Sequence, residues 1–388
     1  MIKAVNCPQA GVCGGCTYQG VPYDEQLEIK NKIVLDFLSE YEILPGEYRP
    51  VRQAGRLTGY RNKMEYSFGD ETKGGSMTLG LHKQGSYMSV LDTDSCIIVP
   101  DAFNSVRAAV LKWAHKSGHG FHHKRSHSGF LRSLVLRRGE RTGEILVNLV
   151  TTSEEELDEE LFCETVFASM RESAPDTLVG VLHTINDRRS DVVACDSVKT
   201  LYGRDYFFEE LLGFSFRVGA FSFFQTNTSA VEFMLQEALT FIPAGWLKNL
   251  YDIYCGTGTI SLALSGRAER ITGIELIEDS VKAATENAER NGINNAVFIC
   301  GDAFEEMDKL PAPDMLVVDP PRMGLHPKAL KRVLEYGLSS ILYISCNPKT
   351  FAQNAAVLKN AGYSVPVLGA YDNFPFTKHI ELAALLTK

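Results

Sequence analysis

The stretch "YDIYCGTGTI" (residues 251–260) places Gly256 and Gly258 directly after an apolar, strand-like run. Glycines at this point let the backbone turn tightly, approach a ligand closely and begin a helix. The acid Glu275 lies near the end of the next apolar run, "RITGIEL", and its carboxylate could accept two ribose hydroxyls. Asp302 follows the third run, where it could reach an adenine amino group. This order predicts a nucleotide-type cofactor site, and an ordinary turn with surface acids is the alternative.

Apolar strand-like runs alternate with helix-like runs from about residue 245 to the end of the chain. Such alternation predicts a doubly wound, mainly parallel sheet, which is a Rossmann-like α/β domain. Before it, short alternating apolar runs broken by glycine and charged turns predict an α+β domain. We therefore expect three segments: a cysteine-rich segment with one helix over 1–47, a central α+β domain over 48–217, and the Rossmann-like domain over 218–388.

The composition narrows the class of protein. Hydrophobic residues make up 45% of the 388 residues, which suits a globular chain with a sizeable core. No apolar stretch approaches the roughly 18–20 residues of a membrane span, and the start lacks the apolar core of a signal peptide. We therefore expect a cytoplasmic protein whose nine cysteines serve as thiols, metal ligands or catalytic groups. The net charge of −9 argues weakly against nucleic-acid binding, although an average can hide a basic patch.

A dinucleotide such as NAD would use the same glycines and acid. Its pattern has a third glycine at the position that Ser261 occupies. After the fourth strand-like run comes "VVDPPRMGLHP", in which Asp319 precedes two prolines that remove backbone donors and stiffen the turn. Together these features resemble class I S-adenosylmethionine-dependent methyltransferases. Arg322 stands where amino-methylating members have an aromatic, and this loop has no cysteine of the kind that cytosine C5-methyltransferases use.

Cys346 lies in "YISCNPKTFAQN", at the carboxyl end of a strand-like run, and Glu381 begins the last such run. Uracil C5 is a poor nucleophile until a thiolate adds to C6, and a base must afterwards remove the C5 proton. This pair of residues fits those two roles. The helix start near Pro348 is expected to favour the thiolate. Taken singly, a buried strand-end thiol and a solvated acid are the plainer interpretations.

Five motifs together resemble the RNA 5-methyluridine methyltransferase family over nearly the whole chain: "SCNPKT", "DPPRMG", "FSFFQTN", "YDIYCGTGT" and "YDNFPFTKHIEL". The resemblance implies S-adenosylmethionine as cofactor, RNA as partner, Cys346 as nucleophile and Glu381 as base. It also implies a pocket for the cofactor and the target base, built from Gln225, Tyr254, Gly256, Glu275, Asp302 and Asp319.

Four cysteines are candidate metal ligands, namely Cys7, Cys13, Cys16 and the distant Cys96. Four thiolates match the ligation of a [4Fe–4S] cluster, and a zinc site from the same cysteines is the alternative. Unligated cysteines are the remaining interpretation. The spacing differs from that of radical enzymes, so we expect a cluster that is structural or positions RNA. The family resemblance supports [4Fe–4S].

The stretch 112–143 collects five of the nine histidines and many lysines and arginines. Such a stretch can track phosphates and stack on splayed bases, which gives Lys124, Arg125, Arg137 and Arg138 as candidate phosphate contacts. A solvated loop is an equal alternative.

The chain begins almost at its first candidate ligand, so we expect it to lack the small β-barrel RNA-binding domain with which many relatives begin. Some bacterial relatives that act on 23S rRNA also lack it. We therefore expect a monomeric enzyme that methylates a uridine of 23S rRNA, with tRNA as the alternative substrate. A non-catalytic iron–sulfur protein that binds RNA or senses redox state is the alternative of another class.

Overall fold

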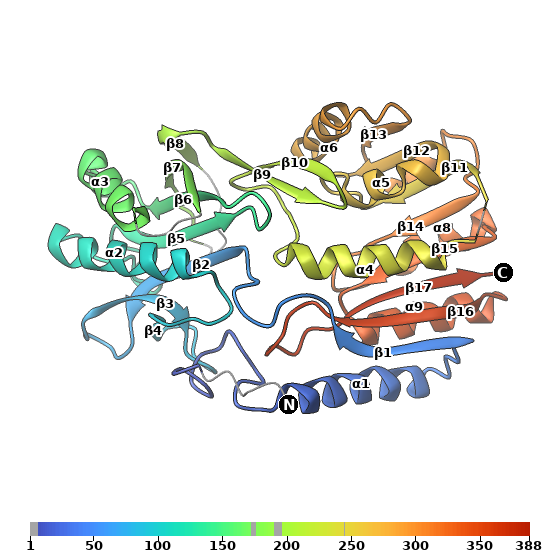
Figure 1. Ribbon diagram of the computed structural model, residues 1–388, viewed down its shortest axis with the longest axis horizontal. Coiled ribbons are helices and arrows are strands. Elements are labelled where there is room, and N and C mark those ends of the chain that lie inside the picture. The colour runs from blue at the N-terminus through green and yellow to red at the C-terminus, as the bar shows by residue number, and fades with distance from the viewer. Residues whose placement is uncertain (1–6, 172–175, 190–195, 244) are drawn as a thin grey trace. The chain divides into compact units, whose positions relative to one another are not determined.

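The chain divides into two compact units in the computed structural model, which describes residues 7–171, 176–189, 196–243 and 245–388 (Figure 1). The first unit comprises Met1–Val21, Arg56–Glu210 and Val218–Phe221. The second unit comprises Pro22–Gly55, Leu211–Arg217 and Ser222–Lys388. Each unit is therefore assembled from separate pieces of the chain.

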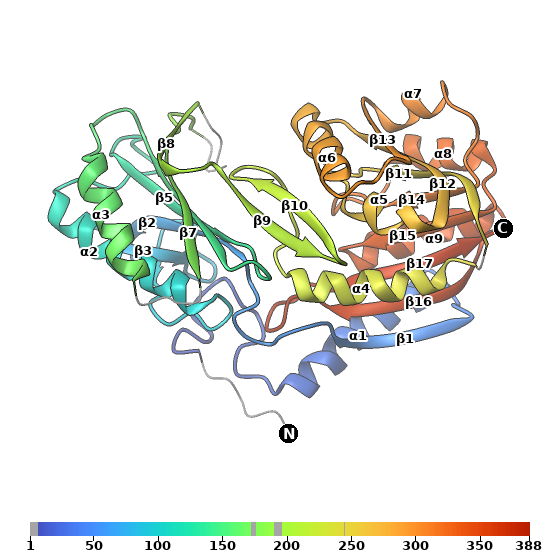
Figure 2. The same ribbon diagram turned by 45° about the horizontal axis from the view of Figure 1, so that its top comes forward.

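The second unit is built on an eight-stranded sheet of order β1-β16-β17-β15-β14-β11-β12-β13. Its strands pair in parallel except β17, which runs antiparallel to both β15 and β16. Figure 2 shows β17 lying within the sheet, with β16 on one side and β15 on the other. The strands are β1 (Glu47–Gln53), β11 (Leu247–Ile253), β12 (Ala268–Glu275), β13 (Ala296–Cys300), β14 (Met315–Val318), β15 (Ser340–Ser345), β16 (Ser364–Asp372) and β17 (Glu381–Thr387).

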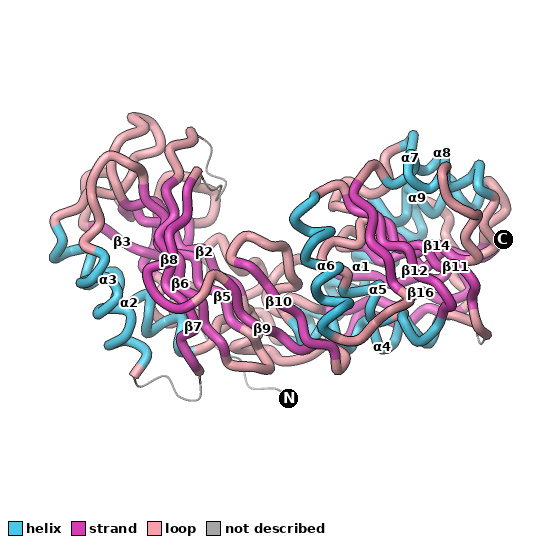
Figure 3. The backbone as a smooth tube through the Cα atoms, turned by 90° about the horizontal axis from the view of Figure 1, so that it is seen from above, coloured by secondary structure: helices cyan, strands magenta, loops and turns pink. Residues whose placement is uncertain are grey.

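Helices cover this sheet on both faces, with α7, α8 and α9 on one side and α4 and α6 on the other (Figure 3). Helices α1, α7, α8 and α9 share one apolar core with the face of the sheet that they cover. Val34, Phe351 and Leu382 contribute fully buried side chains to this core. The helices are α1 (Tyr23–Glu40), α4 (Thr228–Phe241), α5 (Thr259–Ala263), α6 (Glu278–Arg290), α7 (Ala303–Met307), α8 (Pro327–Tyr336) and α9 (Pro348–Asn360), with a short 3₁₀ turn η1 (Ser265–Arg267) after α5.

The first unit is built on a seven-stranded sheet of order β4-β3-β2-β5-β6-β7-β8, in which only β6 and β7 pair in parallel among the described strands. Helices α2 and α3 pack against each other and against β3 and β7, respectively. The elements are β2 (Lys63–Asp70), β3 (Met77–His82), β4 (Val90–Asp92), α2 (Asp101–Ser117), β5 (Leu131–Arg138), β6 (Glu144–Thr151), α3 (Glu159–Met170), β7 (Thr177–Ile185) and β8 (Ser197–Gly203). A separate two-stranded sheet follows, formed by β9 (Tyr206–Leu211) and β10 (Phe214–Gly219).

The expected Rossmann-like sheet is present, but the division of the chain differs from the three expected segments. Helix α1 and strand β1 belong to the second unit rather than to the cysteine-rich segment and the central domain. The reason is tertiary pairing: β1 extends the large sheet by pairing in parallel with β16, and α1 buries Val34 and Leu38 in that sheet's core. A local pattern of helix and strand carries no information about such long-range partners.

None of the helices within the described residues is both long and apolar enough to cross a lipid bilayer.

Candidate active site

The loop after β11 has the backbone geometry that its glycines suggested. Tyr254, Gly256 and Gly258 have φ values of 65°, 54° and 82°, in the left-handed region that favours glycine. A Cβ on Gly258 would lie 3.0 Å from the Phe298 ring, whereas a Cβ on Gly256 would meet nothing within 4 Å. Gly258 is thus required for packing, and Gly256 leaves the loop open to a ligand.

Glu275 and Asp302 lie beside this loop at the same edge of the sheet. The Glu275 carboxylate accepts the N–H groups of Gly256 and Ile277, each at 3.1 Å. Asp302 caps α7, since its Oδ1 accepts the backbone N–H of Phe304 at 3.0 Å. Burial raises the pKa of the Tyr254 phenol, and the negative charges of Asp302 and Glu275 raise it further. The structure therefore brings three of the predicted cofactor residues together.

Asp252 and Ser261 are buried residues of this site that the sequence analysis missed. The Ser261 hydroxyl donates to Asp252 Oδ2 at 2.5 Å, and both residues are 0% exposed. Burial raises the pKa of Asp252 to about 7, with a further contribution from the charges of Asp319 and Glu275. Ser261 occupies the place of the third dinucleotide glycine because it is needed to satisfy this acid. The signal was a carboxylate in the middle of an apolar strand.

The loop after β14 carries Asp319 and is attached to the beginning of α9. The Arg322 carbonyl accepts the Asn347 side-chain amide at 3.0 Å and the Thr350 hydroxyl at 3.3 Å. Asn354 Oδ1 accepts the Leu325 N–H at 2.8 Å. Burial raises the pKa of Asp319 to about 6. The Asp-Pro-Pro loop is thus a rigid part of the sheet edge.

Cys346 and Glu381 meet because β15 and β17 are antiparallel neighbours. The last pair in their register joins Ser345 and Leu382, so one further step places Cys346 opposite Glu381. Directly opposed residues on antiparallel strands have Cβ atoms about 4.5–5.5 Å apart. Both side chains are half-buried. The two residues that carry the expected chemistry are therefore side by side.

The electrostatics at Cys346 differ from the sequence-based expectation. Burial raises the pKa of the Cys346 thiol to about 11, and the charges of Glu381 and Asp319 add to the rise. Arg322 and a backbone hydrogen bond lower the pKa but are outweighed. The expectation that the start of α9 would make Cys346 a thiolate is thus wrong for this arrangement, because two carboxylates and burial dominate.

Glu381 is held close to the pKa that a base needs at neutral pH. Burial raises the pKa of its carboxyl to about 8, the charge of Asp319 adds to the rise, and Arg322 opposes it. Arg322 Nη2 lies 3.3 Å from Nδ1 and 3.4 Å from Nε2 of His379, two residues before Glu381. Arg322 is thus a cation that acts on both the thiol and the carboxyl.

Gln225 lies half-buried in the loop before α4. Two residues later, Asn227 caps α4 and donates its side-chain amide to the Asn373 carbonyl at 2.7 Å. This bond ties the loop to the segment that precedes Glu381. A contact of Gln225 itself with the cofactor or the target base stays a prediction.

Cys7, Cys13, Cys16 and Cys96 line one cavity in the first unit. The loop that carries the first three is joined to β3, since the Gly14 N–H donates to the His82 carbonyl at 2.9 Å. Burial raises the pKa of Cys13, Cys16 and Cys96, with further increases from the charges of the other thiols; for Cys16 the pKa reaches about 12. In the described residues, no three Cys, His, Asp or Glu side chains are grouped as a single metal ion would need.

From the sequence, the four remaining cysteines, Cys163, Cys195, Cys255 and Cys300, are expected to be core or near-core thiols. Cys255 is buried and Cys163 is half-buried, but Cys300 is exposed at the end of β13. The expectation is therefore wrong for Cys300. Cys195 lies outside the described residues.

Of the four candidate phosphate contacts in the stretch 112–143, not all have side chains that are open to solvent. Arg137 is 3% exposed and donates to the carbonyls of Gly219 at 2.6 Å and Ala220 at 3.0 Å. Arg138 is paired with Asp176 at 2.8 Å. The prediction that Arg137 contacts phosphate is thus wrong, because it points into the protein. Lys124 lines a cavity with residues of β2 and β3, and Arg125 is exposed.

Comparisons with known proteins bear on this geometry. A family described as tRNA (uracil-5-)-methyltransferase matches residues 192–311 and 306–388. An uncharacterized RNA methyltransferase of Caldanaerobacter subterraneus is 43% identical over 387 residues, covering 98% of this chain and 84% of that protein. Another, from Clostridium tetani, is 40% identical over 376 residues, covering 97% and 82%. The chain belongs to the tRNA (uracil-5-)-methyltransferase family.

A solved structure extends the likeness to three dimensions. It is the Pyrococcus abyssi tRNA (uracil-54, C5)-methyltransferase in complex with S-adenosyl-L-homocysteine, which is 26% identical with a TM-score of 0.78. The match covers 98% of this chain and 86% of that one. The predicted family, the Rossmann-like fold and the class of enzyme, an S-adenosylmethionine-dependent RNA methyltransferase, are confirmed. The alternative of a non-catalytic protein has no support from these relatives.

The effect of neighbouring charges on the pKa of Cys346 can be tested by the rate at which this thiol is alkylated. A thiol with a pKa of about 11 is only about 0.1% ionised at pH 8, so we expect Cys346 to react slowly with iodoacetamide. Arg322→Gln should slow the reaction further, and Glu381→Gln should accelerate it, because each removes one of the charges that set this pKa. Alkylation followed by peptide mass spectrometry measures the rates. Exposed Cys300 serves as the internal reference, and equal Cys346 rates in all three proteins would contradict the described electrostatics.

Proposed function

We propose that this family member transfers the methyl group of S-adenosylmethionine to C5 of a uridine in RNA, with Cys346 as nucleophile and Glu381 as general base. The observation that carries the proposal is the placement of a thiol and an acid across from each other at the carboxyl edge of the sheet. In open α/β sheets, that edge is where ligands bind.

The chemistry needs both residues in sequence. The Cys346 thiolate adds to C6 of uracil, and the electron pair of the C5–C6 double bond becomes available at C5. C5 then attacks the methyl carbon, whose bond to the sulfonium sulfur breaks with the electron pair leaving on sulfur. The Glu381 carboxylate takes the proton from C5, the C5–C6 double bond forms again, and the C6–S bond breaks to release the thiolate. The cysteine is therefore consumed and regenerated in each turnover.

The cofactor residues have roles that follow from their surroundings. Gly256 leaves the loop open, so its backbone can lie against the cofactor. Glu275 uses its carboxylate for two N–H groups and has acceptor capacity left for ribose hydroxyls. Both helix-capping bonds of Asp302 use Oδ1, so Oδ2 is the oxygen that would accept from the adenine amino group. The proposed pocket is completed by Gln225, Tyr254 and Asp319. Of these, Asp319 carries a charge that raises the pKa of both Cys346 and Glu381.

The four cysteines of the first unit are proposed to hold a [4Fe–4S] cluster. They fit the cluster because their side chains line one cavity, and because Cys13 Sγ accepts the Gly15 N–H at 3.4 Å. Zinc held by the same four cysteines is the alternative, with the four sulfurs about 3.8 Å apart around Zn–S bonds of about 2.3 Å. A cluster, being larger, joins the loop of Cys7, Cys13 and Cys16 to Cys96 by ligation.

The RNA is proposed to be 23S rRNA, the substrate that the sequence analysis expects. A tRNA is the second candidate, which the likeness to the Pyrococcus abyssi tRNA enzyme favours. In either case the target uridine must be extruded from its stack to reach Cys346. Lys124 and Arg125 remain the proposed phosphate contacts of the first unit.

The substrate proposal predicts a specific loss of one modified base. Deleting the gene should remove 5-methyluridine from 23S rRNA while tRNA keeps its full content, as measured by mass-spectrometric mapping of both RNAs from the same cells. Complementation with the unaltered gene should restore the methyl group, and complementation with Cys346→Ala should not. Loss from tRNA alone would overturn the rRNA proposal in favour of the second candidate.

The covalent mechanism predicts opposite behaviour for the two catalytic variants. Cys346→Ala should abolish methylation while still binding cofactor and RNA, since no thiolate can add to C6. Glu381→Gln should accumulate a methylated protein–RNA adduct, visible as a slow band on a denaturing gel, because proton removal stalls after methyl transfer. In the unaltered enzyme, breakdown of the adduct should accelerate as pH rises and level off above about 8, where Glu381 becomes a carboxylate. A Cys346→Ala variant that still methylates RNA would refute the mechanism.

The cluster proposal predicts brown protein after anaerobic purification, with about four iron and four sulfide per chain. Cys96→Ser should lose most of the colour and lower the melting temperature, because the ligand that joins the distant loop is gone. Cys163→Ser, which replaces a cysteine outside the cavity, is the matched control and should keep both. Stoichiometric zinc without sulfide would refute the assignment.

A further inference from the structure

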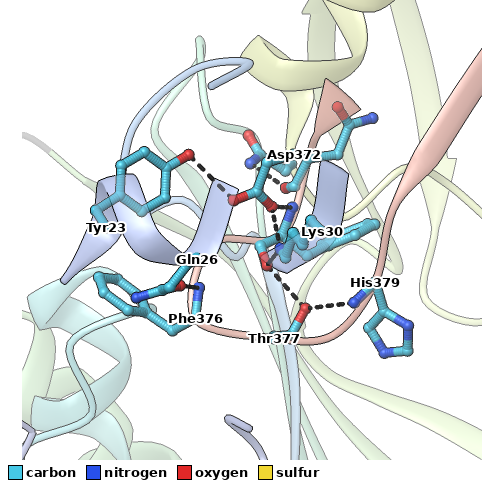
Figure 4. A network of polar contacts seen from close by, with 10 residues as sticks. Tyr23, Gln26, Lys30, Asp372, Phe376, Thr377 and His379 are labelled. Carbon is cyan, nitrogen blue, oxygen red and sulfur yellow. Dashed lines mark hydrogen bonds and ion pairs between the residues drawn. The ribbon is translucent and has the colours of Figure 1, made fainter. Parts of the chain in front are cut away.

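The segment 373–380, which joins β16 to Glu381, is held by buried polar contacts from the distant helix α1 (Figure 4). The central contact is an ion pair between Lys30 of α1 and Asp372, which directly precedes the segment. Both side chains are 0% exposed, and Lys30 Nζ lies 2.6 Å from Asp372 Oδ1. The Tyr23 hydroxyl donates to Asp372 Oδ2 at 3.0 Å. Asp372 is the last residue of β16, so α1 grips the chain where this segment begins.

The same contacts continue along the segment toward Glu381. Lys30 Nζ also donates to the Phe374 carbonyl at 3.3 Å, and that carbonyl accepts the Thr377 hydroxyl at 2.7 Å. The Thr377 hydroxyl in turn accepts the His379 N–H at 3.3 Å. A chain of hydrogen bonds therefore runs from α1 to a residue two positions before Glu381.

Phe376 shows that the segment is held in a costly conformation. Its φ is 67°, which is strained for an aromatic residue, and its N–H donates to Gln26 Oε1 at 3.0 Å. Gln26 is 0% exposed and lies one turn before Lys30 on the same face of α1. Strained backbone of this kind persists only where the surroundings determine it, and here the surroundings are α1.

Stability alone does not account for a buried ion pair. Replacing such a pair with apolar side chains of similar volume is often neutral or stabilising, because two charges must lose their water to pair. The Lys30 ammonium group donates to both the Asp372 carboxylate and the Phe374 carbonyl and so fixes their relative positions. An apolar residue could not do this. The pair therefore sets geometry in the segment that ends at Glu381.

We propose that Lys30, together with Tyr23 and Gln26, is a positioning set that directs the Glu381 carboxylate at the C5 proton of the target uridine. The proposal rests on the role of Glu381 as the base. These three residues contact Asp372, Phe374 and Phe376 rather than Glu381 itself, so they would act on Glu381 through the segment. A displaced base affects the step that it performs, which is proton removal after methyl transfer.

The decisive variant replaces both members of the pair, Lys30→Met with Asp372→Leu, so that no lone charge is left buried. We expect full-length protein that folds, binds S-adenosylmethionine and forms the adduct with 5-fluorouridine RNA at the rate of the unaltered enzyme, since that adduct does not need the base. On ordinary RNA, kcat should fall about 100-fold, which is typical of a group misplaced by 1 Å. KM should barely change, and the methylated adduct should accumulate on a denaturing gel.

The matched control is the exposed pair on the same helix, Lys32→Met with Asp36→Leu, whose side chains are 75% and 61% exposed. It should behave as the unaltered enzyme in every assay. Unchanged kcat in the buried-pair variant would overturn the proposal, as would an equal loss of the 5-fluorouridine adduct, which would mean that the whole site is disturbed. Glu381→Gln measured in parallel separates the two failures: if it accumulates no adduct, the assignment of the base is wrong.

Two milder variants keep the test open should the double variant fail to fold. Tyr23→Phe and Gln26→Met each remove one hydrogen bond to the segment and leave Lys30 and Asp372 paired. Each should lower kcat by about 2–10-fold, which corresponds to the loss of one such bond, with adduct accumulation and unchanged cofactor affinity. Full activity in both variants would overturn the proposal.

Discussion

The antiparallel direction of β17 within an otherwise parallel sheet is the constraint on which the active site depends. In the parallel strands, the residues that follow the carboxyl ends share one edge, and these include Tyr254, Asp319 and Cys346. A further parallel strand would bring its own carboxyl end to that edge. Because β17 runs the other way, it brings its first residue there instead, and that residue is Glu381. An acid at the start of a strand can face a thiol after the end of another only in this topology.

The same edge collects carboxylates, and their charges raise the pKa of Asp252, Cys346 and Glu381 beyond the effect of burial. Burial raises the pKa of Asp252 to about 7, of Asp319 to about 6 and of Glu381 to about 8, and neighbouring carboxylates add to the rise for Asp252 and Glu381. A sulfonium cofactor carries a positive charge, so the ionised members of this set of acids offer it a complementary field. A cation at this place would draw protons off the acids and lower the pKa of Cys346, in the same sense as Arg322. Binding of the cofactor and ionisation of Cys346, the proposed nucleophile, would thus be coupled through charge.

Local sequence patterns were sufficient for the parts of the site that lie at strand ends. The runs before Gly256, Glu275, Asp319 and Cys346 are apolar and bounded by turn residues, and parallel topology brings their ends together. The raised pKa of the Cys346 thiol could not be predicted in this way, because it depends on burial and on two carboxylates, Glu381 and Asp319, that belong to other parts of the sheet edge. The placement of β1 and the burial of Arg137 were missed for a similar reason. Their partners, β16 and the carbonyls of Gly219 and Ala220, are distant in sequence and carry no local signal.

The position of Glu381, the proposed base, also depends on contacts between two segments of the second unit that are far apart in the sequence, α1 and the end of β16. Lys30 and Asp372 are 342 positions apart, and most of the first unit is inserted between α1 and the remainder of the second. Without α1 on the sheet, Asp372 would lack the bonds from Lys30 and Tyr23, and the strained backbone of Phe376 would lack its bond to Gln26. The conformation of segment 373–380 therefore depends on the packing of α1, and so does the place of Glu381, the proposed base, at the end of that segment.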